Sequence, residues 1–200
     1  MLDFEEIEGL VRVFLGLGVR RVRLTGGEPL VRRGLPKLIQ RLAALSPELE
    51  LAMTSNGHLL DRFAAPLYEA GLRGLNVSLD CVDEARFSSL TGGGSLSQVI
   101  SGLEAAKRVG FKRIKLNAVA TRELDPLDSL ALCEWAWMQG YLPRFIEEMP
   151  IGQLGDRRHA PRQNASLRAL IGERYPLHPA ADGDETAGLG PARYLSLIHI

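Results

Sequence analysis

This sequence has few cysteines, no long apolar run and no formal net charge. Only two cysteines occur among its 200 residues, Cys81 and Cys133, and they do not form a Cys-x-x-Cys pair. Two cysteines so spaced argue against a disulfide framework and are too few to build a metal centre from cysteine within this chain. No run of 18 apolar residues is present, so no membrane-spanning helix is expected. We also expect a protein of the reducing cytoplasm, because no signal peptide is recognisable at the start.

The charged residues are balanced in sign. Lysine and arginine together number 24, as do aspartate and glutamate, so the formal net charge is zero. A neutral chain argues against a broad surface for nucleic acid, although it leaves room for a local anion pocket. Because 46% of the residues are apolar, the chain can bury a sizeable core and a globular fold is expected.

Helix and strand patterns alternate along the chain. Asp3, with a glutamate three residues later, has the spacing of a capping box, and apolar residues then recur at helical spacing as far as Gly18. The same ending, a glycine followed by an apolar residue, recurs at Gly71, Gly110 and Gly140. The expected helices span residues 3–17, 36–45, 59–70, 84–90, 98–109, 126–139 and 165–173, and the expected strands span 22–25, 50–55, 75–79, 114–119 and 144–148.

The expected strands are apolar on one side only. Segments such as VRLT, LNVSLD and IKLNAV alternate apolar with polar residues. Strict helix–strand alternation indicates parallel strands joined by crossover helices, and strands covered on both faces would read as continuous apolar runs. We therefore predict an α/β fold, a partial (open) parallel barrel whose interior is polar. Five strands are too few for a complete eight-stranded barrel.

The composition changes at about residue 150. Residues 1–150 are expected to form the barrel, and residues 151–194, in which Gly, Arg, Asp and Pro are frequent at first, are interpreted as the start of a C-terminal region. The last six residues, 195–200 (LSLIHI), follow abruptly and are interpreted as an adapter-derived scar. A short natural apolar tail is the alternative.

Residues 22–30 (VRLTGGEPL) combine a strand with a sharp corner. Gly26 and Gly27 weaken a strand interior and the following proline removes a hydrogen-bond donor, so the strand is expected to end there. A ligand could then approach the bare backbone closely, with the Glu28 carboxylate and the Arg23 guanidinium nearby. The alternative is an ordinary turn in which the glycines only make the bend.

Polar residues collect at the carboxyl ends of the expected strands, where ligands bind in α/β barrels. Three are cations on three different strands, Arg23, Lys115 and Arg144. Because three cations are costly to desolvate without a counter-charge, the pattern favours a polyanionic, phosphate-bearing ligand. Neutralisation by glutamates of the fifth strand is the alternative. The full set of candidates is Arg23, Thr25, Gly26, Gly27, Glu28, Thr54, Ser55, Asn56, Asn76, Ser78, Asp80, Lys115, Asn117, Arg144, Glu147, Glu148 and Met149.

The motifs resemble those of a known family. TGGEP resembles the GGEP motif of the radical S-adenosylmethionine superfamily, whose members have a partial α/β barrel. The ordered set VRLTGGEPLVRR, TSNG, LNVSLD, IKLNAV and RFIEEMPIG resembles, more specifically, the GTP 3′,8-cyclases of molybdenum cofactor biosynthesis. The resemblance runs from about residue 4 to residue 149 and more faintly to residue 194.

This resemblance implies two ligands and their binding residues. The corner at Gly26 and Gly27, called the glycine corner from here on, would contact S-adenosylmethionine through its backbone. The cationic side chains of the strand ends would bind GTP. The implied S-adenosylmethionine site comprises Gly26, Gly27, Glu28, Asn76, Ser78 and Met149. The implied GTP site comprises Arg23, Thr54, Lys115 and Arg144. No catalytic residue and no metal ligand of this chain is assigned.

The implied reaction is a radical cyclisation of the lyase class. An electron donor and a [4Fe–4S] cluster would cleave S-adenosylmethionine to a deoxyadenosyl radical. That radical would take a hydrogen from the GTP ribose and so start the formation of (8S)-3′,8-cyclo-7,8-dihydroguanosine 5′-triphosphate. The protein would supply orientation and exclude water. The resemblance also allows a homodimer, and it implies neither a nucleic-acid partner nor a membrane.

The sequence departs from this family at the cluster ligands. The family carries a CxxxCxxC loop before the first helix and further cysteines near the C-terminus, and neither set is present here. We therefore interpret the chain as an internal fragment that lacks the first strand, both cluster-binding segments and the C-terminal tail. We predict that this polypeptide alone cannot produce deoxyadenosine.

Three other functions stay open on the sequence alone. One is a radical enzyme of the same superfamily that acts on a peptide or another small molecule. Another is a barrel that binds a phosphate ligand without catalysis, and the third is an α/β domain whose charges are structural. Absence of GTP binding by the full-length parent would favour the first. A CxxxCxxC motif in frame upstream of residue 1 would favour the enzyme over the second, and alanine substitution of Arg23 or Lys115 in the parent tests the third.

Overall fold

The computed structural model describes residues 2–120, 125–147, 164–179 and 195–197. Five parallel strands form one sheet in the order β1-β2-β3-β4-β5. The strands are β1 (Arg21–Leu24), β2 (Glu50–Ser55), β3 (Gly74–Ser78), β4 (Ile114–Ala120) and β5 (Leu142–Glu147). The helices are α1 (Phe4–Gly16), the 3₁₀ turn η1 (Pro29–Val31), α2 (Leu35–Ala43), α3 (Leu60–Glu69), α4 (Glu84–Thr91), α5 (Leu96–Val109), α6 (Pro126–Gln139) and α7 (Asn164–Arg174).

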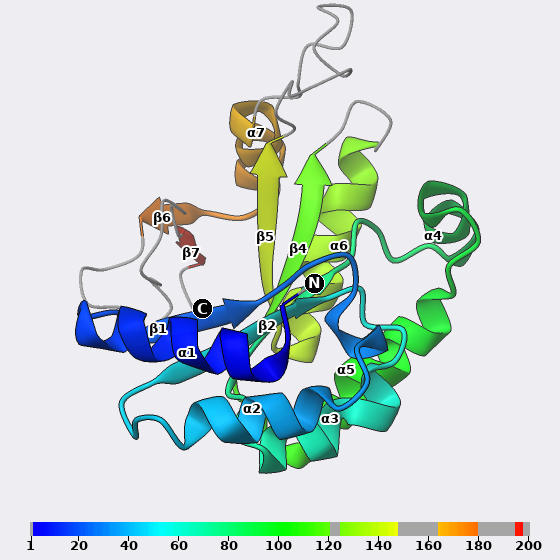
Figure 1. The fold of residues 1–200 in the computed structure, drawn as a ribbon. Helices are drawn as coiled ribbons and strands as arrows, with labels where there is room; N and C mark the ends of the chain where they lie inside the picture. Colours follow the sequence, from blue (N-terminus) through cyan, green and yellow to red (C-terminus); the bar gives the residue numbers. More distant parts are fainter. Residues whose placement is uncertain (1, 121–124, 148–163, 180–194, 198–200) are drawn as a thin grey trace, which may run out of the picture.

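The sequential strand order explains why the helices lie on one side. Each crossover moves to the next strand in the same direction, and right-handed crossovers then place every connecting helix on the same face. Figure 1 shows α2, α3 and α5 together below the sheet, which twists strongly between β1 and β5. One face of the sheet is therefore free of crossover helices, and this arrangement confirms the predicted partial α/β barrel.

The hydrophobic core fills the space between the sheet and these helices. Met53, Val77 and Leu116, which alternate with the polar residues of their strands, are completely buried. From the helices, Leu38, Ile39, Leu60, Leu67, Val99 and Leu103 join the same cluster. Burial of a leucine-sized side chain contributes about 1.5–3 kcal/mol, so this apolar layer fixes which face of each strand is left for polar residues.

The helix ends agree with the sequence patterns. At α1, Asp3 Oδ1 accepts a hydrogen bond from the Glu6 N–H, and Glu6 Oε2 accepts one from the Asp3 N–H, both at 2.8 Å. After α6, Gly140 has φ 73°, a left-handed conformation that glycine adopts at little cost. The N–H of Tyr141 then donates back to the Ala136 carbonyl at 2.8 Å, which directs the chain into β5.

Two strand predictions need correction. The fifth strand begins at Leu142 rather than at residue 144, because β5 is an edge strand of the described sheet and tolerates Pro143, which has no N–H to donate. The sequence also gave no sign of β6 (Leu177–Pro179), which pairs antiparallel with β7 (Leu195–Leu197). Part of the segment interpreted as an adapter-derived scar thus forms a short strand, and its origin stays a prediction.

The described part of the C-terminal region packs against the barrel. Leu167 and Ile171 of α7 form a small buried cluster with Leu130 and Cys133 of α6. The Tyr175 hydroxyl donates to Glu134 Oε1 at 2.7 Å next to this cluster. No helix in the described ranges is long and apolar enough to cross a membrane.

Candidate functional site

The strand register aligns most of the predicted site residues in rows on the polar face of the sheet. Partner residues of adjacent parallel strands lie roughly 5 Å apart. The two rows are Thr54–Asn76–Lys115 and Ser78–Asn117–Arg144. Arg23 of β1 is on the same face, one pair nearer to the amino ends of the strands, where it aligns with Ala52. Three of the four predicted GTP residues therefore lie in the same two rows as two predicted S-adenosylmethionine residues.

The glycine corner after β1 is open at its backbone. A Cβ atom added to Gly26 or Gly27 would meet nothing within 4 Å, so the main chain there faces free space. Gly26 has φ 148°, a conformation that side-chain-bearing residues rarely adopt. A ligand can thus approach this corner closely, as the sequence predicts.

The Glu28 carboxylate fastens this corner to the end of β2. Its Oε1 accepts hydrogen bonds from the Leu30 N–H and the Ser55 hydroxyl, both at 2.9 Å, and its Oε2 accepts from the Asn56 N–H at 2.7 Å. Ser55 was predicted with Thr54 and Asn56 as a candidate on the polar interior of the barrel, and this placement is wrong. It lies on the core face of β2, 2% exposed, because successive residues of a strand point to opposite faces.

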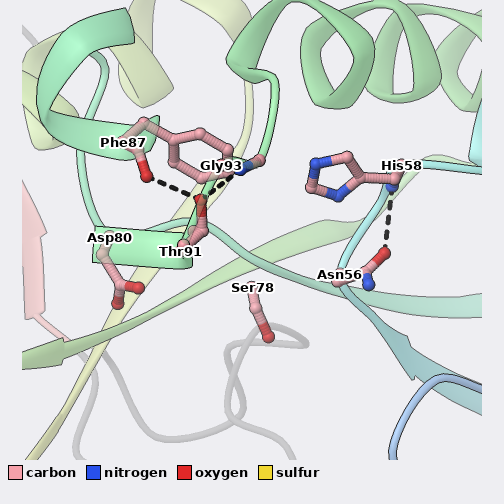
Figure 2. A pocket seen from close by; sticks show the side chains of 9 residues that line it. Asn56, His58, Ser78, Asp80, Phe87, Thr91 and Gly93 are labelled. Atoms are coloured by element: carbon pink, nitrogen blue, oxygen red, sulfur yellow. Dashed lines mark hydrogen bonds between the residues drawn. The ribbon is translucent and has the colours of Figure 1, made fainter. Parts of the chain in front are cut away.

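A pocket of about 480 Å³ lies beyond the ends of β2 and β3. Figure 2 shows Asn56, Ser78 and Asp80 along one side of it and His58 and Phe87 along the other. The remaining lining residues are Thr91, the last residue of α4, and Gly92, Gly93 and Gly94 in the turn between α4 and α5. The pocket adjoins the Ser78 row, so it extends the polar face beyond the sheet.

Two pocket residues hold its walls together. Asp80 Oδ1 accepts a hydrogen bond from the Val119 N–H at 2.8 Å, which joins the end of β3 to β4. Burial raises the pKa of the Asp80 carboxyl, and the Val119 hydrogen bond opposes this shift only in part. His58 Nε2 accepts from the Ser95 N–H at 3.1 Å, so the neutral ring carries its proton on Nδ1. Sequence reasoning gave His58 no role, although its position directly after TSNG was the available signal.

Three buried polar atoms at this end of the sheet have no hydrogen-bond partner among the described residues. They are Asn76 Nδ2, Asn117 Oδ1 and His58 Nδ1. Asn76 is only 4% exposed, yet its amide donates nothing through this nitrogen. Because an unsatisfied buried polar group costs about 1–3 kcal/mol, these atoms indicate positions where a ligand or water supplies the missing partner.

The remaining predicted site residues are less closely defined. Thr54, Lys115 and Arg144 are half-buried, whereas Arg23 and Ser78 are exposed. Glu147 is exposed at the end of β5. Met149 and Glu148 lie outside the described residues, so their predicted place at the site stays a prediction.

The described residues do not fit an iron–sulfur cluster. No group of three histidine, cysteine or acidic side chains that could hold a metal ion occurs among them. The only cysteines of the sequence, Cys81 and Cys133, are buried in two different hydrophobic clusters. A cluster held by three thiolates cannot be built from them.

Comparison with known proteins identifies relatives along the whole chain. The chain is 48% identical over 199 residues to "GTP 3′,8-cyclase 1" of Pseudomonas aeruginosa, covering 99% of this chain and 59% of that protein. It is 46% identical over 211 residues to "GTP 3′,8-cyclase" of Xanthomonas campestris pv. campestris, covering 100% of this chain and 62% of that protein. The chain thus spans about 60% of the length of these curated relatives.

Solved structures show the same fold at low sequence identity. Streptococcus suis SuiB bound to the precursor peptide SuiA matches with a TM-score of 0.66 and 18% identity, over 86% of this chain and 40% of that chain. Methylornithine synthase (PylB) matches with a TM-score of 0.61 and 19% identity, over 72% of this chain and 44% of that chain. At this identity the likeness concerns the fold alone.

The family model of the radical SAM superfamily matches residues 1–134, which is more than half of the chain. This match includes the glycine corner, the residues Thr54, Ser78 and Lys115, and the first four strands of the sheet. The fold and the open glycine corner agree with it. This chain belongs to the radical SAM superfamily.

Proposed function

We propose that this chain forms the nucleotide- and cofactor-binding part of a GTP 3′,8-cyclase, a radical SAM lyase of molybdenum cofactor biosynthesis. The observation that carries the proposal is the pair of aligned rows, which combines cations and neutral polar groups on one open sheet face. The relatives that are 46–48% identical and bear the cyclase name support the same choice.

S-adenosylmethionine fits the glycine corner and the adjoining row. The backbone at Gly26 and Gly27 is open, so the polar end of the cofactor can reach main-chain N–H and C=O groups there. Ser78, which is exposed at the end of β3, adds a hydroxyl. When cleaved by reduction, S-adenosylmethionine supplies a carbon radical that removes hydrogen from a substrate. The chain itself orients the cofactor and keeps the glycine corner in place through Glu28.

GTP fits the cationic residues on the same face. Lys115 and Arg144 occupy neighbouring rows on adjacent strands, and Arg23 adds a charge from β1. Charge-assisted hydrogen bonds from such residues suit the triphosphate, and Thr54 in the Lys115 row adds a hydroxyl. Since the whole chain has no net charge, the affinity for an anion must come from this local arrangement.

Reduction of S-adenosylmethionine requires an electron donor and a cluster that the described residues do not fit. We infer that this polypeptide alone does not cleave S-adenosylmethionine, because it contains only two thiols. Anaerobic reconstitution with iron, sulfide and a reductant, followed by an assay for deoxyadenosine, tests this, and turnover would contradict it. The two free thiols are compatible with the cytoplasm expected from the sequence.

Calorimetry with the full chain tests the proposed ligands. We expect GTP and S-adenosylmethionine each to bind, and we expect Lys115→Ala and Arg144→Ala to weaken GTP binding by about tenfold or more, the effect of one charge-assisted hydrogen bond. Arg20→Ala is the matched control, because Arg20 lies before β1 and pairs on the surface with Glu48. Binding of S-adenosylmethionine without GTP would contradict the cyclase and favour another radical SAM enzyme.

A further inference from the structure

We propose that His58 is a positioning residue, whose ring holds the turn between α4 and α5 in place as one wall of the pocket. This inference rests on the proposed function, because Ser78 of the proposed S-adenosylmethionine site lines the same pocket. By keeping that wall in one conformation, His58 raises the affinity for the cofactor without contacting it.

The first argument is that the turn is packed at one end only. An added Cβ atom at Gly92 or Gly93 would meet nothing within 4 Å, and both residues have positive φ angles, 69° and 105°. At Gly94, by contrast, an added Cβ atom would collide with Thr91 Oγ1 and come within 3.1 Å of His58 Nε2. Because glycines have many conformations to lose, the order of the tip depends on the end of the turn that is packed.

The second argument is that the His58 ring satisfies the first backbone donor of α5. Ser95 is the N-cap of this helix, so its N–H has no partner within the helix. His58 Nε2 accepts from it at 3.1 Å. The Glu84 carboxylate accepts from the next two N–H groups, and the Ser95 hydroxyl accepts from the one after them. Loss of the ring nitrogen would therefore leave the Ser95 N–H without a partner among the described residues.

The third argument is that the ring is itself held in place. The His58 backbone N–H donates to Asn56 Oδ1 at 3.1 Å. The ring stacks on that of Phe87, with the centroids 6.1 Å apart and the planes inclined by 25°. Phe87 is only 2% exposed, so this stacking partner is fixed in the core. A ring held at its backbone and at its face can fix the turn through its remaining edge.

The fourth argument is the place of the turn relative to the two proposed ligands. Across the pocket from His58 lies Ser78, as Figure 2 shows. A wall that keeps one conformation forms the pocket before the cofactor arrives, so that binding costs less conformational entropy. Lys115 and Arg144 do not line this pocket. The affinity for GTP, measured without the cofactor, should therefore not depend on the His58 ring.

The test measures S-adenosylmethionine and GTP separately by calorimetry on the full chain. His58→Phe keeps an aromatic ring beside Phe87 but removes the acceptor. We expect it to weaken S-adenosylmethionine binding by about tenfold, the effect of leaving one buried donor unpaired, and to leave GTP binding unchanged. His58→Gln supplies an amide oxygen that can accept from the Ser95 N–H, so it should restore most of the affinity. His178→Phe is the matched control, because His178 is exposed in β6 and should affect neither ligand.

Hydrogen exchange of the Ser95 amide reports on the contact directly. Exchange should be faster in His58→Phe than in the unmodified chain, and slow again in His58→Gln, because only the phenylalanine lacks an acceptor. Saturating S-adenosylmethionine should slow this exchange further in the unmodified chain. If His58 served only the overall stability, His58→Phe would instead speed exchange throughout the core helices.

Several outcomes would overturn the inference. They are equal affinity of the unmodified chain and His58→Phe for S-adenosylmethionine, an equal loss of affinity for both ligands, and failure of His58→Gln to restore binding. If His58→Phe does not fold, the unmodified chain decides, and Ser95 exchange that S-adenosylmethionine does not slow overturns the inference. An unmodified chain that does not bind S-adenosylmethionine overturns both this inference and the proposed cofactor. Binding of S-adenosylmethionine that depends on His58, without any GTP binding, would support this inference while contradicting the cyclase proposal.

Discussion

Glu28 uses one carboxylate to satisfy three donors, the backbone of Leu30, the hydroxyl of Ser55 and the backbone of Asn56. Its position in GGEP suggests direct contact with a ligand. Its geometry suggests a second role, because the carboxylate fixes the glycine corner relative to the end of β2. Only the folded chain shows this, since Glu28 and Ser55 are 27 residues apart.

The first prediction concerns this carboxylate. Glu28→Gln replaces one acceptor oxygen by an NH₂ group that must face a donor, so at least one hydrogen bond is lost. We expect a loss of about 1–3 kcal/mol in the free energy of unfolding, measured by urea denaturation. Glu48→Gln is the control, because its pair with Arg20 is on the surface and should change stability by less than about 1 kcal/mol. Equal effects of the two substitutions would argue against the fastening role.

The second prediction concerns the buried Asp80. Its pKa is raised by burial in the folded chain, whereas in the unfolded chain it titrates near the ordinary value of 3.8. The folded state therefore retains the proton to higher pH, so the contribution of Asp80 is fully present below the unfolded pKa and is lost as pH rises through the folded pKa. Asp80→Asn keeps an oxygen for the Val119 N–H and does not titrate.

Unfolding curves of the unmodified chain and of Asp80→Asn, recorded from acidic to neutral pH, measure the difference between their free energies of unfolding. The stability of the unmodified chain relative to Asp80→Asn should fall as the pH rises over this range. A constant difference would show that the Asp80 carboxyl has the same pKa in both states.

At the scale of elements, helices α3 and α5 pack directly against each other. Gly102 of α5 lies against this contact, and a Cβ atom there would come within 2.7 Å of the Gly57 carbonyl oxygen and 2.9 Å of Leu60 Cβ. Gly57, the last residue of TSNG, and the start of α3 are therefore held by the close approach of α5. This contact supports the pocket wall that carries His58.

The third prediction compares two helical glycines. Gly102→Ala should destabilise the chain by about 1–3 kcal/mol, because the backbone must move to admit the methyl group. Gly9→Ala in α1 is the matched control, since nothing lies within 4 Å of its added Cβ. It should stabilise the chain by up to about 1 kcal/mol through helix propensity. Thermal denaturation of both variants measures the difference, and stabilisation by both would contradict the close packing.

The ends of helices were predictable from the sequence where residues close together in the chain determine them. The capping box at Asp3 and the glycine endings at Gly110 and Gly140 depend on neighbours in sequence, and these predictions are confirmed. Strand alternation also indicated the polar face correctly. The Glu28–Ser55 and Asp80–Val119 contacts join residues that are distant in the chain, so no periodicity reveals them. The start of β5 at Leu142 was not predicted, because an edge position, which tolerates Pro143, cannot be recognised from the strand itself.

At the scale of the whole molecule, the described residues form two hydrophobic clusters of unequal size. The main cluster joins the sheet to its helices and contains Cys81. The smaller cluster joins α6 to α7 and contains Cys133. Burial raises the pKa of both thiols, that of Cys133 to about 12, with the neighbouring Glu134 adding to the shift of Cys133. Each cysteine therefore reports on the opening of one cluster.

The fourth prediction uses these thiols. Neither should react with a disulfide reagent in the folded chain, because both are buried and the thiolate is scarce. In single-cysteine chains made by Cys81→Ala or Cys133→Ala, Cys133 should become reactive at a lower urea concentration than Cys81, since release of α7 alone uncovers it. Reaction of both at the same urea concentration would show that the two clusters open as one unit.

Consecutive hydrogen bonds lead away from the glycine corner. Glu28 accepts from the Asn56 backbone, Asn56 Oδ1 accepts from the His58 backbone at 3.1 Å, and the His58 ring accepts from the backbone of Ser95. A ligand that immobilises the glycine corner also immobilises this series, and with it the strand end next to Thr54. A second ligand then binds residues that are already ordered, so its binding costs less conformational entropy. The two ligands should therefore bind with positive cooperativity. Thermodynamic reciprocity requires each to raise the affinity of the other by the same factor.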